Sequence, residues 1–203
     1  VQDDNKTIYL ISSSGKILWK RTIDEKIKSD LHQIDLYKNN KLQILFNTNK
    51  KIYLIDRNGD NVTNFPIKLP KEATIPLTLI DYDNNRNYRI IIACGDSILN
   101  YNTAGNTVEG WQFNKSSSKI YQPIQLFQAL GKDYIVIYEN NGTINLLNRK
   151  GQSRINVKEN IDLSTNSFYL EKGDNLSSSF IMNTQKDGSV VKILFNGELN
   201  RDE

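Results

Sequence analysis

Residues 52–59 read IYLIDRNG, a short apolar run that stops four residues before a glycine. The same arrangement occurs five times along the chain, with glycines spaced by 44, 46, 46 and 46 residues. These glycines are Gly15, Gly59, Gly105, Gly151 and Gly197. A fixed period of this length indicates a repeat architecture, in which each interval forms one supersecondary unit that stacks on its neighbours.

The residues before each glycine predict a strand that enters a tight turn. Small or polar residues lead into the glycine, as in SSSG at 12–15 and NTAG at 102–105. Such a sequence favours a type I turn that ends in the left-handed conformation, which glycine adopts without a Cβ penalty. Apolar residues stand seven and four positions before each glycine: Ile8, Ile52, Ile98, Ile144 and Val190, then Ile11, Ile55, Tyr101, Leu147 and Ile193.

Each complete interval contains four β-type runs and no helical pattern. A nearly continuous apolar run predicts a strand buried on both faces; these are Leu42–Phe46, Arg89–Cys94, Tyr134–Tyr138 and Phe180–Met182. Before them come Ile34–Tyr37, Leu77–Tyr82, Ile124–Leu130 and Phe168–Leu170. After the turns we expect outer strands at Ile17–Ile23, Val62–Leu69, Val108–Phe113 and Arg154–Val157. Four short strands per repeat of this length indicate an all-β fold, a β-propeller or partial propeller of four-stranded antiparallel blades.

The period divides residues 1–203 into about five repeats of a single propeller domain or segment. Three are expected to be whole blades, at about 31–74, 75–120 and 121–164. The first (1–30) has only its last two strands, and the fifth (165–203) runs out just after its turn. A propeller cut within a blade leaves unpaired edges. We therefore expect either a piece of a longer protein or two ends that complete one blade, and a dimer through exposed blade edges is an alternative.

Composition excludes several classes of function. The chain has 26 basic and 23 acidic residues, a net charge of +3 that is spread without a basic block, so nothing supports nucleic-acid binding. No apolar run approaches the roughly 20 residues of a membrane span, and no signal peptide opens the chain. Length is sufficient for a core without disulfides.

The residue types needed for catalysis are scarce. Cys94 ends an apolar strand and is expected to be a buried, inert thiol, and His32 has no second histidine or cysteine with which to build a zinc site. No glycine-rich phosphate loop precedes a helix. We therefore expect no enzyme and no catalytic or cofactor-binding residues. A propeller enzyme would need convergent carboxylates, such as Asp56, Asp81, Asp83 or Glu109.

The loop Asp81-Tyr-Asp83-Asn-Asn85 is a candidate calcium site. Oxygen ligands at alternate positions suit a hard cation that takes six to eight oxygens. The loop resembles the D-x-D-x-D-G loops of FG-GAP and VCBS-type propellers, but it has Asn87 and Arg89 where that pattern expects a further acidic ligand, and it lacks the glycine. A polar hairpin tip held by hydrogen bonds from the Asp side chain is the alternative.

Residues 9–23, YLISSSGKILWKRTI, resemble the repeat of the quinoprotein-like (PQQ-like) propellers, whose blades close with G-K-x-x-W. The resemblance implies that Trp19, and Trp111 six residues after Gly105, pack between adjacent blades. The non-enzymatic outer-membrane assembly lipoprotein propellers of this family bind proteins. Its dehydrogenases need a vicinal cysteine pair that this chain lacks, so the resemblance argues against redox chemistry.

Aromatic side chains near loop ends could line a binding face, although most such residues in a propeller lie between blades. They are Tyr53, Phe65, Trp111, Phe113 and Tyr121. The expected function is that of a non-enzymatic protein-interaction or scaffold module, with an unidentified protein partner, in a bacterial envelope protein outside the cytoplasm; this rests on fold analogy. The alternative is a glycan- or small-ligand-binding propeller, and a propeller enzyme comes last.

Overall fold

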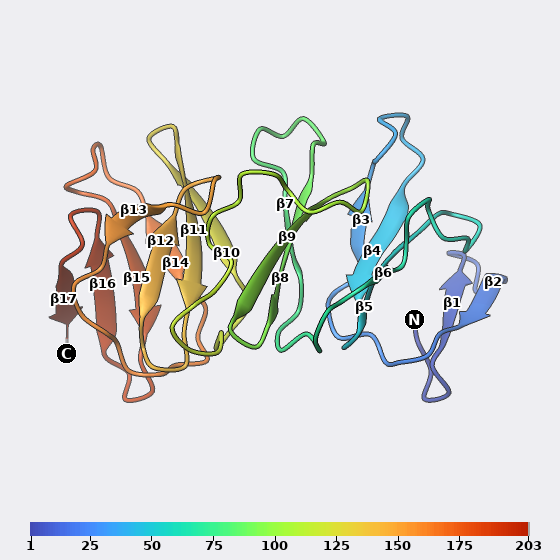
Figure 1. The fold of residues 1–203 in the computed structure, drawn as a ribbon, viewed down its shortest axis with the longest axis horizontal. Coiled ribbons are helices and arrows are strands. Elements are labelled where there is room, and N and C mark those ends of the chain that lie inside the picture. Colours follow the sequence, from blue (N-terminus) through green and yellow to red (C-terminus); the bar gives the residue numbers. More distant parts are fainter. Residues whose placement is uncertain (203) are drawn as a thin grey trace. The chain divides into compact units, whose positions relative to one another are not determined.

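The computed structural model describes residues 1–202, and these form an all-β fold (Figure 1). The strands are β1 (Thr7–Ile11), β2 (Ile17–Thr22), β3 (His32–Ile34), β4 (Gln43–Asn47), β5 (Lys51–Ile55), β6 (Ile67–Lys68), β7 (Thr78–Ile80), β8 (Arg89–Cys94), β9 (Ser97–Asn102), β10 (Gln125–Ala129), β11 (Lys132–Tyr138), β12 (Ile144–Leu147), β13 (Ser153–Asn156), β14 (Tyr169–Glu171), β15 (Phe180–Thr184), β16 (Val190–Leu194) and β17 (Leu199–Asp202). Within residues 1–202 there is no helix that could cross a membrane.

The strands form five antiparallel meanders in which neighbours in sequence are neighbours in the sheet. Three sheets have four strands, in the orders β3-β4-β5-β6, β10-β11-β12-β13 and β14-β15-β16-β17. The sheet β7-β8-β9 has three strands and the sheet β1-β2 has two. This is the strand order of propeller blades, which confirms the predicted fold class.

All five repeat glycines close the same turn. Their φ angles lie between 74° and 90°, in the left-handed region. In each turn the glycine N–H donates to the carbonyl three residues earlier, as from Gly59 to Asp56 (3.1 Å) and from Gly197 to Leu194 (2.9 Å). The predicted turn is therefore confirmed at every repeat, and it explains why a Cβ-bearing residue would be strained at these positions.

Two compact units divide the chain. The first contains residues 1–95 and 99–108, and the second contains residues 96–98 and the chain from residue 109 on. In the first unit, Ile34, Leu45, Ile52, Leu54 and Ile90 pack into a core with almost no exposure. In the second, the core forms around Tyr138, Leu146, Phe168, Ile181 and Ile193. The strands that we predicted to be buried, Arg89–Cys94 in particular, supply much of these cores.

The third repeat lacks the outer strand that we predicted at Val108–Phe113. Gly110 adopts a φ of 78°, which interrupts the extended backbone, and the N–H of Gln112 donates to the carbonyl of Lys150 in the next repeat (2.8 Å). Only isolated bridges, such as Tyr101 to Thr107, tie this segment to its own sheet. The hydrogen bonds of this segment are therefore divided: the Val108 N–H donates to the Asn100 carbonyl of its own sheet (2.8 Å), whereas Gln112 bonds to the neighbouring repeat.

The outer strand of the second repeat is shorter than the predicted Val62–Leu69. Only Ile67–Lys68 pairs as a strand, after Asn64 in a left-handed conformation (φ 69°) and Pro66, which has no N–H to donate to a ladder. These two residues confine regular pairing to the end of the run.

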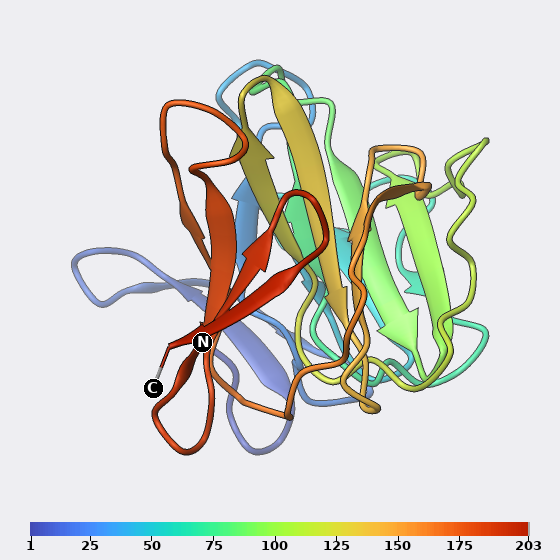
Figure 2. The ribbon, with the colours of Figure 1, turned by 90° about the vertical axis from the view of Figure 1, so that its left-hand side faces the viewer.

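The fifth repeat has a strand beyond its turn that we did not predict. Leu199–Asp202 pairs with β16 from Ile193↔Leu199 to Val190↔Asp202. The last sheet is therefore a complete four-stranded blade. Figure 2 shows this end of the chain in red, facing the viewer. The first repeat has the two strands expected there.

Candidate binding surface

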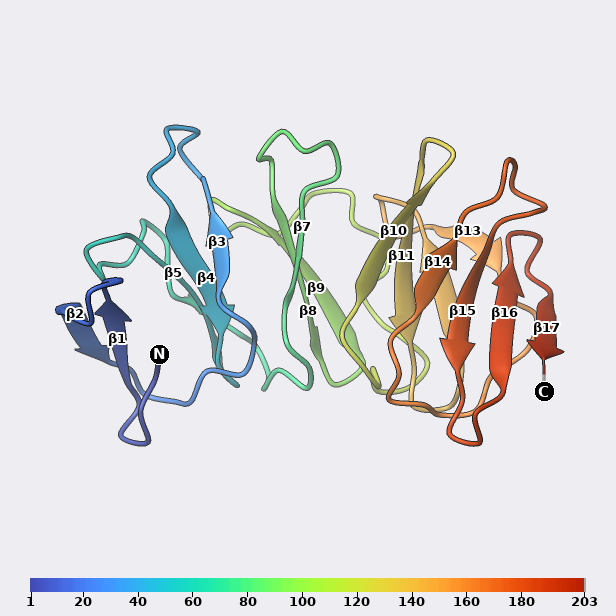
Figure 3. The ribbon, with the colours of Figure 1, turned by 180° about the vertical axis from the view of Figure 1, so that it is seen from behind.

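Two loops at one end of the first unit form a single polar surface. Residues 35–42 connect β3 to β4 and residues 81–88 connect β7 to β8; both loops project from the ends of their sheets in Figures 1 and 3. We call residues 35–42 and 81–88 the paired loops. They occupy the same position in consecutive repeats.

An aspartate organises each of the paired loops in the same way. Asp35 accepts hydrogen bonds from the N–H groups of Asn39 (3.0 Å) and Asn40 (2.9 Å). Asp81 accepts them from Asn85 (3.1 Å) and Arg86 (2.8 Å), the residues four and five positions later, as for Asp35. Left-handed backbone at the third and fifth positions, at Lys38, Asn40, Asn84 and Arg86, allows this geometry.

The paired loops are also joined to each other. The Arg86 guanidinium forms an ion pair with Asp35, whose side chain is only 5% exposed. The Asp35 N–H donates to the Tyr88 hydroxyl (3.2 Å) and the Lys38 ammonium donates to the Asn87 side-chain oxygen (3.3 Å). These links cross from one repeat to the next, so the two loops form one ordered platform.

The pKa of the Asp35 carboxyl lies below its ordinary value. Burial acts to raise this pKa, but the N–H groups of Asn40 and Asn39 and the positive charge of Arg86 together outweigh burial. Asp35 is thus held as a carboxylate at neutral pH. It serves to fix the loops and has little surface to offer a ligand.

The outer surface of the platform presents two exposed apolar side chains among polar ones. Tyr37 is 57% exposed and Leu42 is 41% exposed, and Asn39, Asn40 and Lys41 lie between them on the exposed tip. Tyrosine provides rigid apolar area with a polar end, and asparagine provides adaptable hydrogen bonds, which is the composition favoured at recognition loops.

The predicted metal residues Asp81, Asp83 and Asn85 all lie in the second of the paired loops. Asp81 uses both carboxylate oxygens as described above, and the Asn85 side-chain oxygen accepts the N–H of Asn87 (3.0 Å). Within residues 1–202 no three His, Cys, Asp or Glu side chains gather as a metal-binding group. The calcium hypothesis also includes an asparagine oxygen as a ligand, and it stays a prediction. If it is right, millimolar Ca²⁺ should raise the melting temperature of the protein, and Asp83→Ala should remove this effect.

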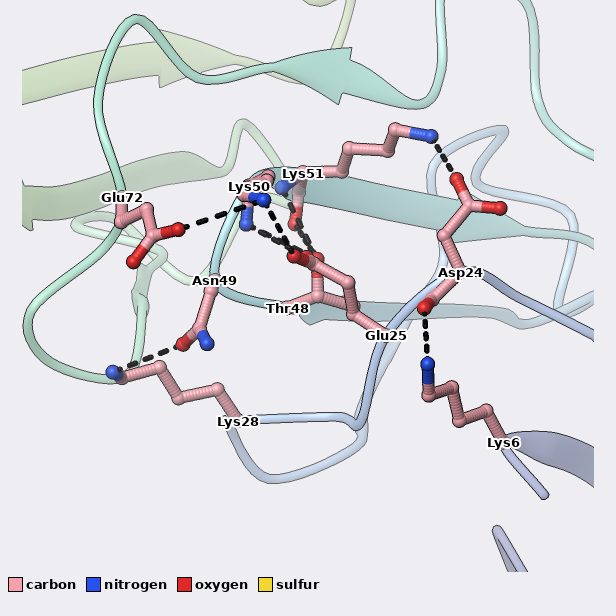
Figure 4. A network of polar contacts seen from close by, with 9 residues as sticks. All are labelled: Lys6, Asp24, Glu25, Lys28, Thr48, Asn49, Lys50, Lys51 and Glu72. Atoms are coloured by element: carbon pink, nitrogen blue, oxygen red, sulfur yellow. Dashed lines mark hydrogen bonds and ion pairs between the residues drawn. The ribbon is translucent and has the colours of Figure 1, made fainter. Parts of the chain in front are cut away.

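A second polar region of the first unit is an ion-pair network between repeats (Figure 4). Lys51 pairs with Asp24, the Lys50 N–H donates to Glu25 (2.9 Å), and the Lys50 ammonium lies 3.6 Å from Glu72. The hydrogen bond from Lys51 lowers the pKa of Asp24, and the same contact raises the pKa of Lys51. Acidic and basic side chains neutralise each other's charge here. We therefore interpret the network as a structural clamp that holds the chain after β2 against the β4–β5 turn.

Trp19 packs against the next repeat, as the resemblance implied. A Cβ on Gly59 would lie 2.9 Å from the Trp19 ring, and the indole N–H donates to the carbonyl of Arg57 (2.8 Å). A polar pocket of about 330 Å³ borders this contact and is lined by Trp19, Lys20, Arg21, Asn58, Gly59, Asp60 and Asn61. Trp111 similarly covers Gly151 in the second unit.

Other candidate residues have structural roles. Tyr53, Phe65 and Trp111 are buried, so they are not part of a binding face. Cys94 is buried, as we predicted, and its burial raises the pKa of the thiol. That the thiol is inert stays a prediction.

The carboxylates that an enzyme would need lie in turns and loops. Asp56 accepts N–H groups within the Gly59 turn, Asp81 and Asp83 are in the paired loops, and Glu109 adjoins the bend at Gly110. His32 lies half-buried on β3, and its burial lowers its pKa.

The sequence did not predict that the paired loops lie together, because Asp35 and Arg86 are 51 residues apart. The signal that could have indicated it is an aspartate followed by asparagines at the same position in both repeats.

No protein-family model and no curated protein sequence matches this chain. In fold it is similar to BBS1N in a crystal structure with ARL6DN soaked with lead, at 10% identity and a TM-score of 0.59, over 94% of this chain and 58% of that one. A mercury-soaked crystal of the same complex gives 15% identity and a TM-score of 0.60, over 87% and 56%. A protein of unknown function from Bacteroides caccae gives 14% identity and a TM-score of 0.46, over 96% and 63%.

The likeness to BBS1N shows the fold, a β-propeller, at identities too low to show more. The chain spans less than two thirds of the length of each of these chains. The PQQ-like family, the bacterial envelope and the extracytoplasmic location stay predictions.

Proposed function

We propose that this protein is a non-enzymatic protein-binding module and that the paired loops contact the partner. The observation that carries the proposal is the ordered platform itself: Asp35, Arg86 and Tyr88 join two loops and leave Tyr37 and Leu42 exposed on it. A rigid surface loses little conformational entropy on binding, which favours recognition. The fold supports this proposal by analogy, since BBS1N was solved in complex with ARL6DN.

The surface also has the polarity of a transient protein interface. The Asp35–Arg86 pair neutralises the charges at the base of the platform, while Lys38 and Lys41 bring positive charge and Asp83 brings negative charge nearer the tips. Mixed charge around exposed aromatic and aliphatic anchors is typical of non-obligate interfaces. A folded protein or a peptide is therefore the expected class of ligand.

A selection from a displayed peptide and protein-domain library tests this proposal. We expect ligands that bind the wild-type chain and lose at least about tenfold in affinity with the double variant Tyr37→Ala, Leu42→Ala. Leu130→Ala is the matched control, because Leu130 is also an exposed apolar residue (54%) but lies at the β10–β11 turn. Ligands that bind both variants as well as wild type would place the binding surface elsewhere and contradict the proposal.

The second candidate is a glycan- or small-ligand-binding propeller, which the pocket beside Trp19 favours. Its lining provides an indole ring, two cationic side chains and three Asn or Asp side chains, which could pair with a polar ring-shaped ligand. Binding on a glycan array that Trp19→Phe with Asn61→Ala abolishes, with no protein ligand for the paired loops, would favour this candidate over the first.

A further inference from the structure

Asparagine precedes glycine at three places in the chain, Asn58-Gly59, Asn141-Gly142 and Asn196-Gly197. Glycine has no Cβ beside its backbone nitrogen, so this nitrogen can attack the side-chain amide of the preceding asparagine with little steric hindrance. A bond forms between the glycine nitrogen and the asparagine Cγ, the nitrogen loses its proton to solvent, and ammonia leaves. Water then opens the succinimide ring at either of its carbonyls, which gives aspartate or isoaspartate.

The three sites share one turn conformation. Gly59, Gly142 and Gly197 have φ angles of 90°, 86° and 87°. Each glycine N–H donates to the carbonyl three residues earlier, at 3.1, 3.0 and 2.9 Å respectively, and it must leave this acceptor before the nitrogen can attack. All three asparagines are exposed. Access to water therefore does not distinguish the sites, and the hydrogen bonds that hold the reacting groups do.

Two of the asparagine side chains are held at both ends of the amide. The Asn141 nitrogen donates to the Ser117 hydroxyl (3.0 Å), and the Asn141 oxygen accepts the Thr143 N–H (3.1 Å). At Asn196 the nitrogen donates to the Glu198 carboxylate (2.9 Å) and the oxygen accepts the Glu198 N–H (3.0 Å). Rotation of either amide toward the glycine nitrogen therefore breaks two hydrogen bonds.

The Asn58 side chain is held at one end only. Its nitrogen donates to the Asp56 carboxylate over 3.4 Å, which is long for a hydrogen bond. Within residues 1–202 its oxygen accepts no hydrogen bond. The Asn58 amide is therefore the one that can turn toward its glycine at the smallest cost.

The glycine carbonyls show the same difference. The carbonyls of Gly142 and Gly197 each accept a backbone N–H from another segment, both at 3.0 Å. The Gly59 carbonyl accepts instead from the Arg21 guanidinium (2.9 Å). A long side chain has rotational freedom that a paired backbone lacks, so the turn at Gly59 is the easiest of the three to open locally.

We propose that Asn58 is a site of spontaneous deamidation, and that the reaction loosens the contact between Trp19 and the second repeat. A Cβ on Gly59 would lie only 2.9 Å from the Trp19 ring, so the turn is closely packed there. Isoaspartate adds one methylene to the backbone of this turn. The new carboxylate at position 58 also joins Lys20 and Arg21 in the lining of the pocket beside Trp19. The proposal is independent of the paired loops.

Peptide mapping by mass spectrometry, after incubation of the folded chain in mildly alkaline buffer, tests the site. We expect aspartate and isoaspartate to form at Asn58 at least about fivefold faster than at Asn141 and Asn196, because those amides must break more hydrogen bonds. In urea the three rates should lie within about twofold of one another, because the turns are unfolded. Equal rates in the folded chain, or a lead for Asn58 that urea leaves unchanged, would overturn the proposal.

Two variants separate the hydrogen bond from the charge. Arg21→Met removes the donor to the Gly59 carbonyl and should speed deamidation at Asn58 by at least about twofold, with no change at Asn196. Lys20→Met is the matched control, because Lys20 lines the same pocket and within residues 1–202 makes no hydrogen bond to Gly59. No acceleration in Arg21→Met, or equal acceleration in both variants, would contradict the role given to this bond.

The melting temperature during the same incubation tests the consequence. In wild type it should fall by at least about 2 °C as position 58 is converted, because the contact with Trp19 is lost. Asn58→Gln should keep its melting temperature, although Asn141 and Asn196 are still present. A wild-type melting temperature that stays constant after conversion, or an equal fall in Asn58→Gln, would show that the Trp19 contact does not depend on this reaction.

Discussion

The turns at Gly15 and Gly197 have the same backbone conformation but differ in how closely other residues pack against them. Both glycines have a left-handed φ, 80° and 87°, and both donate to the carbonyl three residues earlier at 2.9 Å. At Gly197 a Cβ would lie 2.1 Å from the Asn156 carbonyl oxygen, while at Gly15 no atom of the described residues would lie within 4 Å of it. The comparison shows that local sequence makes the turn and that the neighbouring repeat decides how much a change in the turn costs.

Alanine at these two glycines should separate conformation from packing, and we expect the largest effect here. Gly15→Ala should cost about 1 kcal/mol of unfolding free energy, the penalty of a left-handed non-glycine residue. Gly197→Ala should cost about 3 to 4 kcal/mol, since the overlap with the next backbone adds to that penalty. Urea unfolding measures both. Equal losses would mean that the contact at Asn156 adapts to a Cβ without cost.

The matched isoleucines four residues before the glycine give the next comparison. Ile55→Ala should lower the unfolding free energy by about 3 kcal/mol, because Ile55 is 1% exposed and the change leaves a cavity. Ile11→Ala, at 45% exposure, should cost less than about 1 kcal/mol. The two residues belong to one unit, so one unfolding transition reports both. A large loss for Ile11→Ala in dilute solution would show that the first sheet is covered within the single chain.

The smallest expected effect concerns pH and His32. Burial lowers the pKa of His32 below 6.5, with Asp30 partly opposing it, so the folded protein binds the proton less well than the unfolded chain. Stability should therefore be constant above pH 6.5 and fall as the pH drops from 6.5 through the lowered pKa. Urea unfolding between about pH 5 and pH 7 should show this slope in wild type and not in His32→Gln.

The range matters because other groups act in stronger acid. Asp24 and Glu25 have lowered pKa values in the clamp, so their contribution is lost only as the pH falls below about 4. A slope that persists between pH 5 and pH 7 in His32→Gln would assign it to another group.

The sequence predicted the fold where the signal is local. The strand Arg89–Cys94 was predicted with the bounds that it has. A nearly continuous run of apolar residues is typical of a strand that is buried on both faces. The prediction failed at Val108–Phe113, where the backbone N–H of Gln112 bonds to Lys150, 38 residues later, and not to its own sheet. It also missed β17, whose exposed residues Asn200–Asp202 have no apolar pattern.

The candidate site divides in the same way. The sequence around Asp81 predicted that this residue lies in a polar loop. It also offered, as an alternative to a calcium site, hydrogen bonds between the Asp81 side chain and the loop backbone, which the structure shows. The sequence did not predict the ion pair between Arg86 and Asp35, because ion pairs between loops depend on the stacking of two repeats.

By itself, therefore, the sequence determined the five turns, the period and the four-strand unit, since these depend on glycine conformation and on apolar residues at fixed short spacing. Only the tertiary structure decided which faces are covered. The same apolar position is buried at Ile55 and exposed at Ile11, because burial depends on the sheet packed alongside, and no residue within the repeat encodes whether that neighbour is present.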